Sequence, residues 1–267
     1  MCSMAHLSQD ENMIRAISDG LDLHSFTASS MLGVEYDDVV IVKKLSDIED
    51  WDVRYKTAHD KYGLGAADVD VLFMRAPELL GARRAAKAIG FGLMYGRGPG
   101  ALADELGVSR KEAKQKIADW FSTFPGVKQY ISDIQCQAID GEDHAVFTIM
   151  GRPRRLHNIV STNHGVSAKA ERDAINAPIQ GSASCIAKLA MILIDQDPEL
   201  GGDCLEGGSA NAQMLLQVHD EIILEVGEEQ DLQCLNDKMQ QIMVNAAQLS
   251  VPLTTSGGIA TNWGEAK

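Results

Sequence analysis

The chain has 267 residues, of which 45% are hydrophobic, and a formal net charge of −14. A chain of this length and apolar content can bury one large core or two modest cores. Its five cysteines are scattered without zinc-ligand or redox spacing, which predicts buried free thiols in a reducing compartment. We see no signal-peptide layout and no apolar run approaching a membrane span, so we expect a cytoplasmic protein with no membrane partner.

The first part of the chain predicts helices separated by polar turns. Residues 5–32 suggest two helical stretches, which Asp19 and Gly20 punctuate. Acidic turns and a mixed run over 47–62 fill residues 34–80. No internal repeat is apparent.

Residues 83–96 carry a stripe of functional side chains. Arg83, Lys87, Phe91 and Tyr95 recur every four residues, and each such step drifts by about 40° on an α-helix, so all four share one face. Two cations suit a triphosphate, and two aromatic rings suit a base or sugar. The alternative is an amphipathic helix with solvated cations. The opposite face favours the functional interpretation, because its alanines and glycines suit close packing and each glycine costs roughly 1 kcal/mol within a helix.

Local signals mark the elements that follow this helix. Glycine and proline over 96–100 predict its end. Ser109 and Glu112 have the spacing of a capping box that opens a helix towards Phe121. Pro125 suits the first turn of the next helix, which we expect to reach about Asp140.

The second half of the chain alternates strands and helices. The expected elements are a hairpin over 145–149 and 154–157, a helix over 167–195, a glycine-rich loop over 201–208, strands over 214–218 and 222–226, a helix over about 228–249 and a final strand over about 252–258.

The two later strands flank the most informative residues of the chain, His219, Asp220 and Glu221. A tight hairpin turn would hold the two adjacent carboxylates in a rigid, exposed place. Neighbouring acids repel each other, so a fold that keeps them together usually compensates them with a divalent cation. A solvated turn without a ligand is the alternative interpretation of this trio.

Together these segments resemble the C-terminal polymerase portion of family A DNA polymerases, the group of bacterial DNA polymerase I and its phage relatives. The matching segments are the fingers-helix motif at 83–96, the metal-carboxylate motif at 217–226, the primer and template motif at 171–181, the segment 22–28, and the ending formed by 251–253 with Asn262 and Trp263. Their order and spacing agree over most of the chain.

The resemblance implies an α+β fold, with a polymerase palm built from an antiparallel sheet with helices and a mainly helical fingers region. Residues 1–33 would be the helical start of palm and fingers, and 34–80 an insertion in the fingers. Residues 81–145 would form the fingers and 146–267 the palm with its metal-carboxylate hairpin.

The implied activity is template-directed DNA synthesis from dNTPs on primer-template DNA by a two-metal mechanism with Mg²⁺. Asp220 would bind metal, and Glu221 would support the site. Lys87 would bind triphosphate and protonate the leaving pyrophosphate. The resemblance assigns the other residues to the nucleotide (Arg83, Phe91, Tyr95 and His24) and to DNA (His219, Arg172, Asn176, Gln180 and Gly96). For Arg172 and Asn176 a purely structural role is the alternative.

The sequence departs from the family pattern at its start. The family's first catalytic motif, which carries a second metal-binding aspartate, should lie immediately before residues 3–8. We therefore expect a split or truncated enzyme, in which a second polypeptide supplies this motif and the thumb. A non-catalytic nucleotide- or DNA-binding remnant is the alternative. If the source is a phage, the expected compartment is the host cytoplasm.

The net negative charge is unusual for a nucleic-acid-binding protein. Basic residues nevertheless outnumber acidic ones over 83–116 and over 152–172. Such local patches can bind phosphate, although the negative electrostatic field of the whole chain should weaken its association with nucleic acid at low salt.

Overall fold

The computed structural model describes residues 1–201, 212–227 and 230–265. The first half of the chain forms the helices α1 (Cys2–Ser8), α2 (Glu11–Ser18), α3 (Leu23–Leu32), α4 (Tyr36–Ser46), α5 (Trp51–Tyr62), α6 (Ala66–Met74), α7 (Ala76–Met94), α8 (Pro99–Leu106), α9 (Arg110–Thr123) and α10 (Pro125–Asp140). The second half contains β1 (Ala145–Phe147), β2 (Pro153–Arg155), the 3-10 helix η1 (His157–Val160), α11 (His164–Asp195), β3 (Ala212–Val218), β4 (Glu221–Val226) and α12 (Leu232–Asn245). These elements confirm the predicted α+β class.

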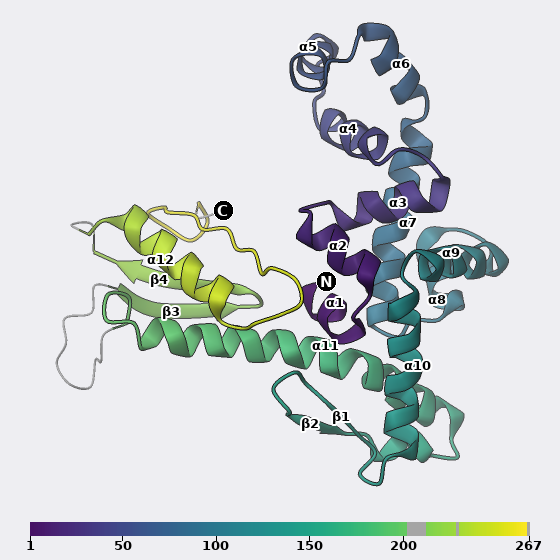
Figure 1. Ribbon diagram of the computed structural model, residues 1–267, viewed down its shortest axis with the longest axis vertical. Helices are drawn as coiled ribbons and strands as arrows, with labels where there is room; N and C mark the ends of the chain where they lie inside the picture. Colours follow the sequence, from purple (N-terminus) through teal and green to yellow (C-terminus); the bar gives the residue numbers. More distant parts are fainter. Residues whose placement is uncertain (202–211, 228–229, 266–267) are drawn as a thin grey trace.

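The elements are arranged around two long helices, α7 and α11 (Figure 1). Helix α7 joins the lobe of α4, α5 and α6 to the middle of the molecule, where α1, α2, α9 and α10 lie. Helix α11 extends from this middle region to the part formed by β3, β4 and α12. The β1–β2 hairpin lies beside α11 and α10.

The main core forms where these helices meet. The rings of Trp120 and Phe124 lie 4.9 Å apart, and both side chains are buried. Ile89 of α7 and Ile175 of α11 belong to the same apolar cluster. Burial of these large side chains fixes α7 against α11, since each contributes roughly 1.5–3 kcal/mol when removed from water.

Several helix boundaries follow from the predicted local signals. The hydroxyl of Ser109 accepts a hydrogen bond from the Glu112 amide at 3.2 Å, while the Glu112 carboxylate accepts one from the Ser109 amide at 2.9 Å. This is the predicted capping box, and α9 begins at the next residue. Pro125 is the first residue of α10, as predicted. The expected break at Asp19 and Gly20 separates α2 from α3, and α1 and α2 are separated by a further break.

Residues 34–80 fold as a helical lobe with a small core of its own. Leu45, Ala58 and Val69, from α4, α5 and α6, are fully buried together. On the same lobe the Arg54 guanidinium lies 4.1 Å from the centroid of the Trp51 ring and 4.5 Å from that of Phe73. The assignment of this lobe as an insertion stays a prediction, as do the other domain boundaries.

The later hairpin has its predicted form. Strands β3 and β4 pair antiparallel from Ala212 opposite Val226 to Val218 opposite Glu221. One face packs on α12 and on the end of α11, through Ile194 and Leu235 among others. The predicted loop over 201–208 lies outside the described residues from 202 onwards. The following helix starts at Leu232, after the cap Asp231, and the predicted start at Glu228 also falls outside the described residues.

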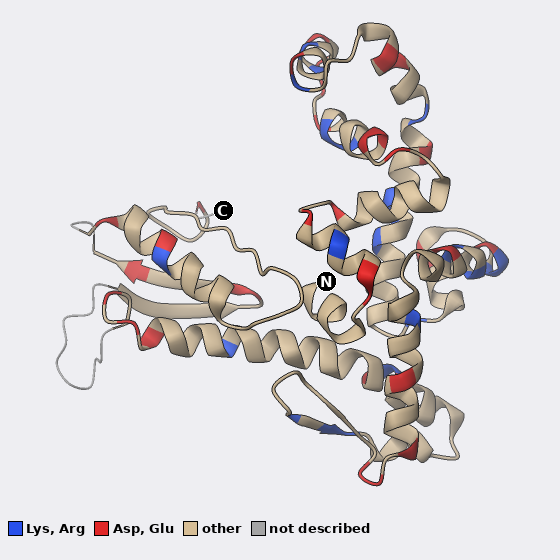
Figure 2. Cartoon of the chain, viewed as in Figure 1, with Lys and Arg blue, Asp and Glu red and all other residues tan. Residues whose placement is uncertain are grey.

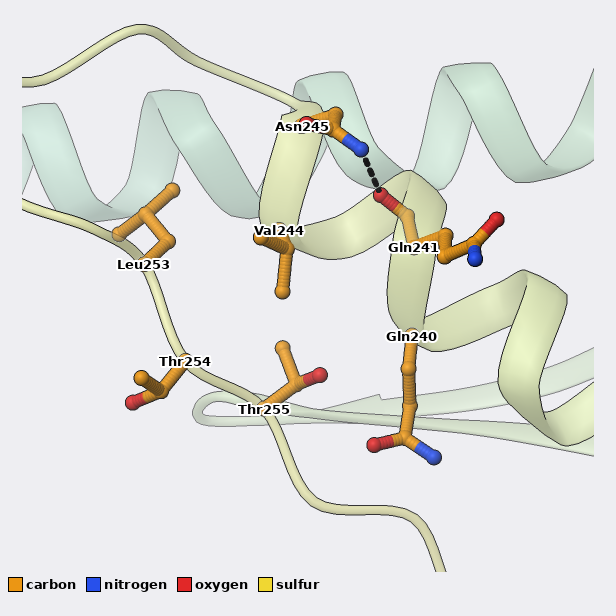
Figure 3. Close-up of a pocket in the computed structure, with 7 residues that line it drawn as sticks. All are labelled: Gln240, Gln241, Val244, Asn245, Leu253, Thr254 and Thr255. Atoms are coloured by element: carbon orange, nitrogen blue, oxygen red, sulfur yellow. Dashed lines mark hydrogen bonds between the residues drawn. The ribbon is translucent and has the colours of Figure 1, made fainter.

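The predicted final strand over 252–258 is wrong. This segment lies along α12 without pairing to a strand (Figure 3), and the described sheets contain two strands each. Gly257 explains the difference, because a Cβ there would collide with the Asn236 side chain of α12. The segment is therefore held by close contact with α12 and does not extend the β3–β4 sheet.

A shallow groove of about 320 Å³ separates this segment from α12 (Figure 3). Its lining consists of uncharged side chains: Gln240, Gln241, Val244, Asn245, Leu253, Thr254 and Thr255. None of the predicted site residues lies in it. Just before the groove, Ser250 bonds to the His6 ring at 3.1 Å, which ties the C-terminal segment to α1.

Helix α11 corrects the expectation that no apolar run approaches a membrane span. By length and composition alone it is long and apolar enough to cross a membrane. Ala174 and Ile179 of this helix pack in the main core, and Ser182 bonds to the backbone beside β1. The cysteines of the described residues are free thiols, as predicted: Cys2, Cys136, Cys185 and Cys234. Their predicted burial holds only for Cys185, since Cys2 is half-buried and Cys136 and Cys234 are exposed.

Candidate functional site

The predicted stripe lies on α7, with its aromatic end exposed and its other end partly buried. Lys87 and Phe91 face solvent, and Tyr95 caps the helix C-terminus with its ring exposed. Arg83 is partly buried at the other end of the stripe. The four side chains therefore follow one face, as the four-residue spacing predicts.

The opposite face of α7 packs closely because its residues are small. A Cβ at Gly92 would lie 2.6 Å from Cδ2 of the fully buried Leu102. At Gly90 a Cβ would lie 3.6 Å from the Trp120 indole. The glycines thus let α8 and α9 approach the helix, which confirms the packing role inferred from the sequence.

Arg83 has a partner that the sequence analysis missed. Its guanidinium forms an ion pair with Asp22 at 2.7 Å and donates through Nε to Ser25 Oγ at 3.1 Å. Asp22 also caps α3 by accepting from the Ser25 amide at 2.8 Å. Burial by itself would raise the pKa of Asp22, but the Arg83 guanidinium and the Ser25 amide outweigh it and lower that pKa. Asp22 therefore stays ionised and holds Arg83 in place.

The sequence marks Asp22 as a helix N-cap but does not reveal its pairing with Arg83. Asp22 stands just before an apolar helical run, which is the usual place of a helix N-cap. Its pairing with Arg83 joins residues 61 apart in the chain, so local patterns alone do not reveal it.

His24 lies against the same stripe. Its ring centroid is 5.8 Å from that of Phe91, with the two planes tilted by 44°. Burial lowers the pKa of His24, and the charges of Arg83 and Lys87 lower it further, although Asp22 opposes them. The imidazole is therefore neutral near pH 7. The fold thus brings together four predicted nucleotide residues: His24, Arg83, Lys87 and Phe91.

Gly96 joins this site to α11. Its φ is +64°, and a Cβ there would lie 2.6 Å from Arg172 Cγ and 2.8 Å from Arg172 Cα. The left-handed conformation and the close approach both require glycine. The predicted DNA residues Gly96 and Arg172 therefore meet where the fingers helix ends.

The other DNA residues predicted on α11 follow Arg172 at four-residue intervals. Gln180 is exposed, whereas the Asn176 Oδ1 atom is buried and has no hydrogen-bond partner in the described part of the chain. A buried acceptor without a donor costs about 1–3 kcal/mol. Asn176 is therefore a position at which a donor from a bound group would add stability.

The carboxylate hairpin presents its acids to solvent. Val218 pairs with Glu221, so His219 and Asp220 form the two-residue turn, and all three polar residues are exposed. His219 has a φ of 55°, and its carbonyl accepts a hydrogen bond from the Gln217 side chain. In Figure 1 the turn points from the β3–β4 part towards the N-terminal helices.

The acids of this turn do not make a complete metal site by themselves. No three His, Cys, Asp or Glu side chains gather into a possible metal site among residues 1–201, 212–227 and 230–265. Two neighbouring carboxylates offer the hard oxygen ligands that Mg²⁺ prefers. They fit one side of a magnesium site, whose remaining ligands must come from elsewhere.

Asp10, one of the acids near the N-terminus, has a structural role. Its carboxylate accepts from the Met13 amide at 2.9 Å and from the Gly126 amide at 2.7 Å. The side chain is buried and joins α2 to α10.

Cations without carboxylate partners among residues 1–201, 212–227 and 230–265 gather on two further surfaces (Figure 2). Strand β2 is exposed along its length and carries Arg154 and Arg155, next to the exposed Arg152. Helix α9 presents exposed lysines at 111 and 114. The basic stretches predicted from the sequence thus lie on the surface despite the net negative charge.

Comparison with known proteins identifies the family. The model of DNA polymerase family A matches residues 44–265. The chain belongs to DNA polymerase family A. It is 38% identical over 264 residues to DNA polymerase I of Streptococcus pneumoniae serotype 4, covering 99% of this chain and 25% of that protein. It is 36% identical over 265 residues to DNA polymerase I of Mycobacterium leprae, covering 98% of this chain and 24% of that protein.

A solved structure agrees with this assignment. The polymerase domain of Pol1 from M. smegmatis, in complex with DNA primer-template and dNTP, is 36% identical and superposes with a TM-score of 0.75. The match covers 99% of this chain and 38% of that chain. The chain thus has the fold of that part of the polymerase domain, and it spans about a quarter of the length of the curated relatives.

Proposed function

We propose that this chain provides the fingers and part of the palm of a DNA-directed DNA polymerase, which transfers nucleotides from dNTPs to a primer 3′-hydroxyl. The gathering of Arg83, Lys87 and Phe91 on one face of α7, with His24 of α3 packed against them, carries this proposal. The family assignment and the M. smegmatis complex with primer-template and dNTP support it.

The cations of α7 would hold the triphosphate. Arg83 uses Nε and Nη2 for Ser25 and Asp22, and its guanidinium has further N–H groups for phosphate oxygens. The exposed ammonium of Lys87 would neutralise the same group and donate a proton to the leaving pyrophosphate oxygen. Neutral His24 can donate one N–H without adding charge.

The aromatic end of the stripe would contact the nucleoside. Phe91 is held against His24, so its ring offers a fixed surface for the sugar and base. Tyr95 and Gly96 follow at the end of the helix, where the nascent pair would lie. The close approach of Gly96 to Arg172 supports a position of the proposed DNA contacts of α11 beside the proposed nucleotide contacts.

Asp220 would contribute a metal ligand from the hairpin turn, with Glu221 beside it and His219 at the primer end. Bound Mg²⁺ would supply Lewis-acid stabilisation of the phosphoryl transfer and activation of the primer hydroxyl. The other carboxylate ligands, with the thumb, would come from a segment outside this sequence, either on the same polypeptide or on a second one. We place the reaction in the cytoplasm.

A non-catalytic nucleotide- or DNA-binding protein is the second candidate. The incomplete ligand set among the described residues favours it. The two candidates differ in turnover, since such a protein would bind dNTP and primer-template but would never extend a primer.

Primer extension by the polymerase in its natural assembly distinguishes them. We expect Asp220→Asn to reduce extension by about a thousandfold or more, the range for removal of a major electrostatic contributor to catalysis. Glu225→Gln is the matched control, because it removes the same charge from an exposed position of the same hairpin. It should leave primer extension within about twofold of wild type. Equal activity of the two variants would contradict the proposed role of Asp220, and absence of extension by the wild-type assembly would favour the second candidate.

A further inference from the structure

A cavity of about 310 Å³ lies between α4 and the first half of α7, away from the exposed Lys87–Phe91 surface. Its lining comes from both helices: Lys43, Ser46, Asp47, Pro77, Leu80, Arg83 and Arg84. This volume falls within the range of small-molecule sites, roughly 300–1,000 Å³. The cavity therefore has room for a small ligand beside the fingers helix.

The charges of the lining favour an anion. Three cations face one carboxylate, that of Asp47. Arg83 is anchored to Asp22 outside the cavity, whereas Arg84 is exposed and has no hydrogen bond or ion pair among the described residues. A guanidinium in this state can bind phosphate oxygens through two parallel N–H groups.

The one anion in the lining is weakly held there. Asp47 pairs with Lys43 four residues earlier on α4, and its side chain is 68% exposed. Exposed pairs of this kind contribute about 0.3–0.5 kcal/mol, so an incoming anion can displace the carboxylate into solvent. Displacement would free the Lys43 ammonium for the ligand.

We infer that this cavity is a binding site for a condensed phosphate, either the polyphosphate tail of a nucleotide or free pyrophosphate. The geometry gives α4, and with it the lobe of residues 34–80, a role in holding phosphate next to Arg83. The choice of ligand rests on the proposed function, whereas the site itself rests on the cavity and on the unpaired Arg84.

Tripolyphosphate binding to the chain tests the site, by calorimetry without DNA or metal. A Lys87→Gln background removes the proposed nucleotide contact, so that the cavity is measured by itself. In this background we expect binding to persist, and Arg84→Gln or Lys43→Gln to weaken it by about five- to tenfold. Lys44→Gln is the matched control, because Lys44 is the exposed neighbour of Lys43 and does not line the cavity.

The outcomes separate the possibilities. Equal losses in the Lys43 and Lys44 variants would show a general charge effect and overturn the inference, as would absence of binding in the background protein. Lys43→Arg should retain binding, which excludes unfolding as the cause. Repeating the titration with dATP and with pyrophosphate identifies the ligand. At a nucleotide site, Arg84→Gln weakens the binding of both ligands, whereas at a pyrophosphate site it weakens the binding of pyrophosphate alone. Primer extension is not needed, so failure of the proposed function leaves this test intact.

Discussion

The stripe on α7 and the turn of the β3–β4 hairpin differ in how far the described chain completes them. Around the stripe, Asp22 holds Arg83, His24 packs on Phe91, and Gly96 touches Arg172. At the turn, Asp220 and Glu221 are exposed, and no described side chain completes a metal site around them. One region is organised in advance, whereas the other presents two exposed acids with no third metal-binding side chain beside them among the described residues.

This difference has a physical reason. Cations and rings can be fixed by neighbours within the chain before a ligand arrives, since ion pairs and ring contacts are favourable without it. Two adjacent carboxylates repel each other, so they are tolerated in a solvated turn until a cation compensates them. The stripe should therefore bind a nucleotide with this chain alone, while catalysis should depend on additional ligands.

The largest expected effect on the stripe comes from Lys87→Gln. A hydrogen bond to a charged group contributes about 1.5–3 kcal/mol, so we expect dATP affinity to fall about 10- to 100-fold. Equilibrium titration measures this loss. Lys111→Gln on α9 is the control and should change affinity less than twofold, or about 0.4 kcal/mol. Similar losses in both variants would mean that only the general charge of the chain matters.

Gly96→Ala should destabilise the junction between α7 and α11. The φ of +64° and the contact with Arg172 Cα both oppose a side chain, and we expect a loss of about 1–3 kcal/mol in the free energy of unfolding. Gly98→Ala is the matched control, since a Cβ there meets nothing within 4 Å. Urea denaturation measures both, and an unchanged midpoint for Gly96→Ala would contradict the tight junction.

Two glycines of α7 should respond in opposite directions. Gly92→Ala would press on the buried Leu102 and should cost about 1–3 kcal/mol. Gly81→Ala meets nothing within 4 Å and should stabilise the helix by about 0.4–1 kcal/mol. Thermal unfolding of the two variants checks the sign of each change. Two shifts of the same sign would argue against the packing described for this face.

The smallest effect is expected from Asp22→Asn. The pKa of Asp22 is lowered in the folded chain, so its pair with Arg83 adds stability above the ordinary value of 3.8 and loses it as the pH falls through the lowered value. The pair is partly exposed, which limits its contribution to about 1 kcal/mol or less. Urea denaturation should show a difference between wild type and variant at pH 6 to 7 that shrinks below about pH 4. A constant difference would contradict the ion pair.

Local signals in the sequence predict α7, α9, α10, α11, α12 and both hairpins. They did not predict α4, α5 and α6, where the sequence suggested acidic turns and a mixed run. The capping box of Ser109 and Glu112, the first-turn Pro125 and the strand pair around His219 are each specified by a few neighbouring residues. The four-residue spacing likewise predicts the stripe, because helical geometry requires nothing else.

Long-range contacts explain what the sequence did not predict. The prediction of a final strand over 252–258 was wrong because Gly257 lets the segment approach α12, and no local sequence pattern indicates that contact. The pair of Asp22 with Arg83 also joins distant residues. At the site, the sequence gives the chemistry of the side chains, and the fold decides which of them meet.

The central claim is that a nucleotide bound to the α7 stripe also faces Asp220. Paramagnetic broadening of backbone amide signals by Mn²⁺–dATP tests it directly, with Mg²⁺–dATP as the diamagnetic control. We predict broadening at Lys87 and Phe91 together with Asp220 and Glu221. Broadening confined to α7, with the hairpin signals unchanged at saturating nucleotide, would contradict the claim.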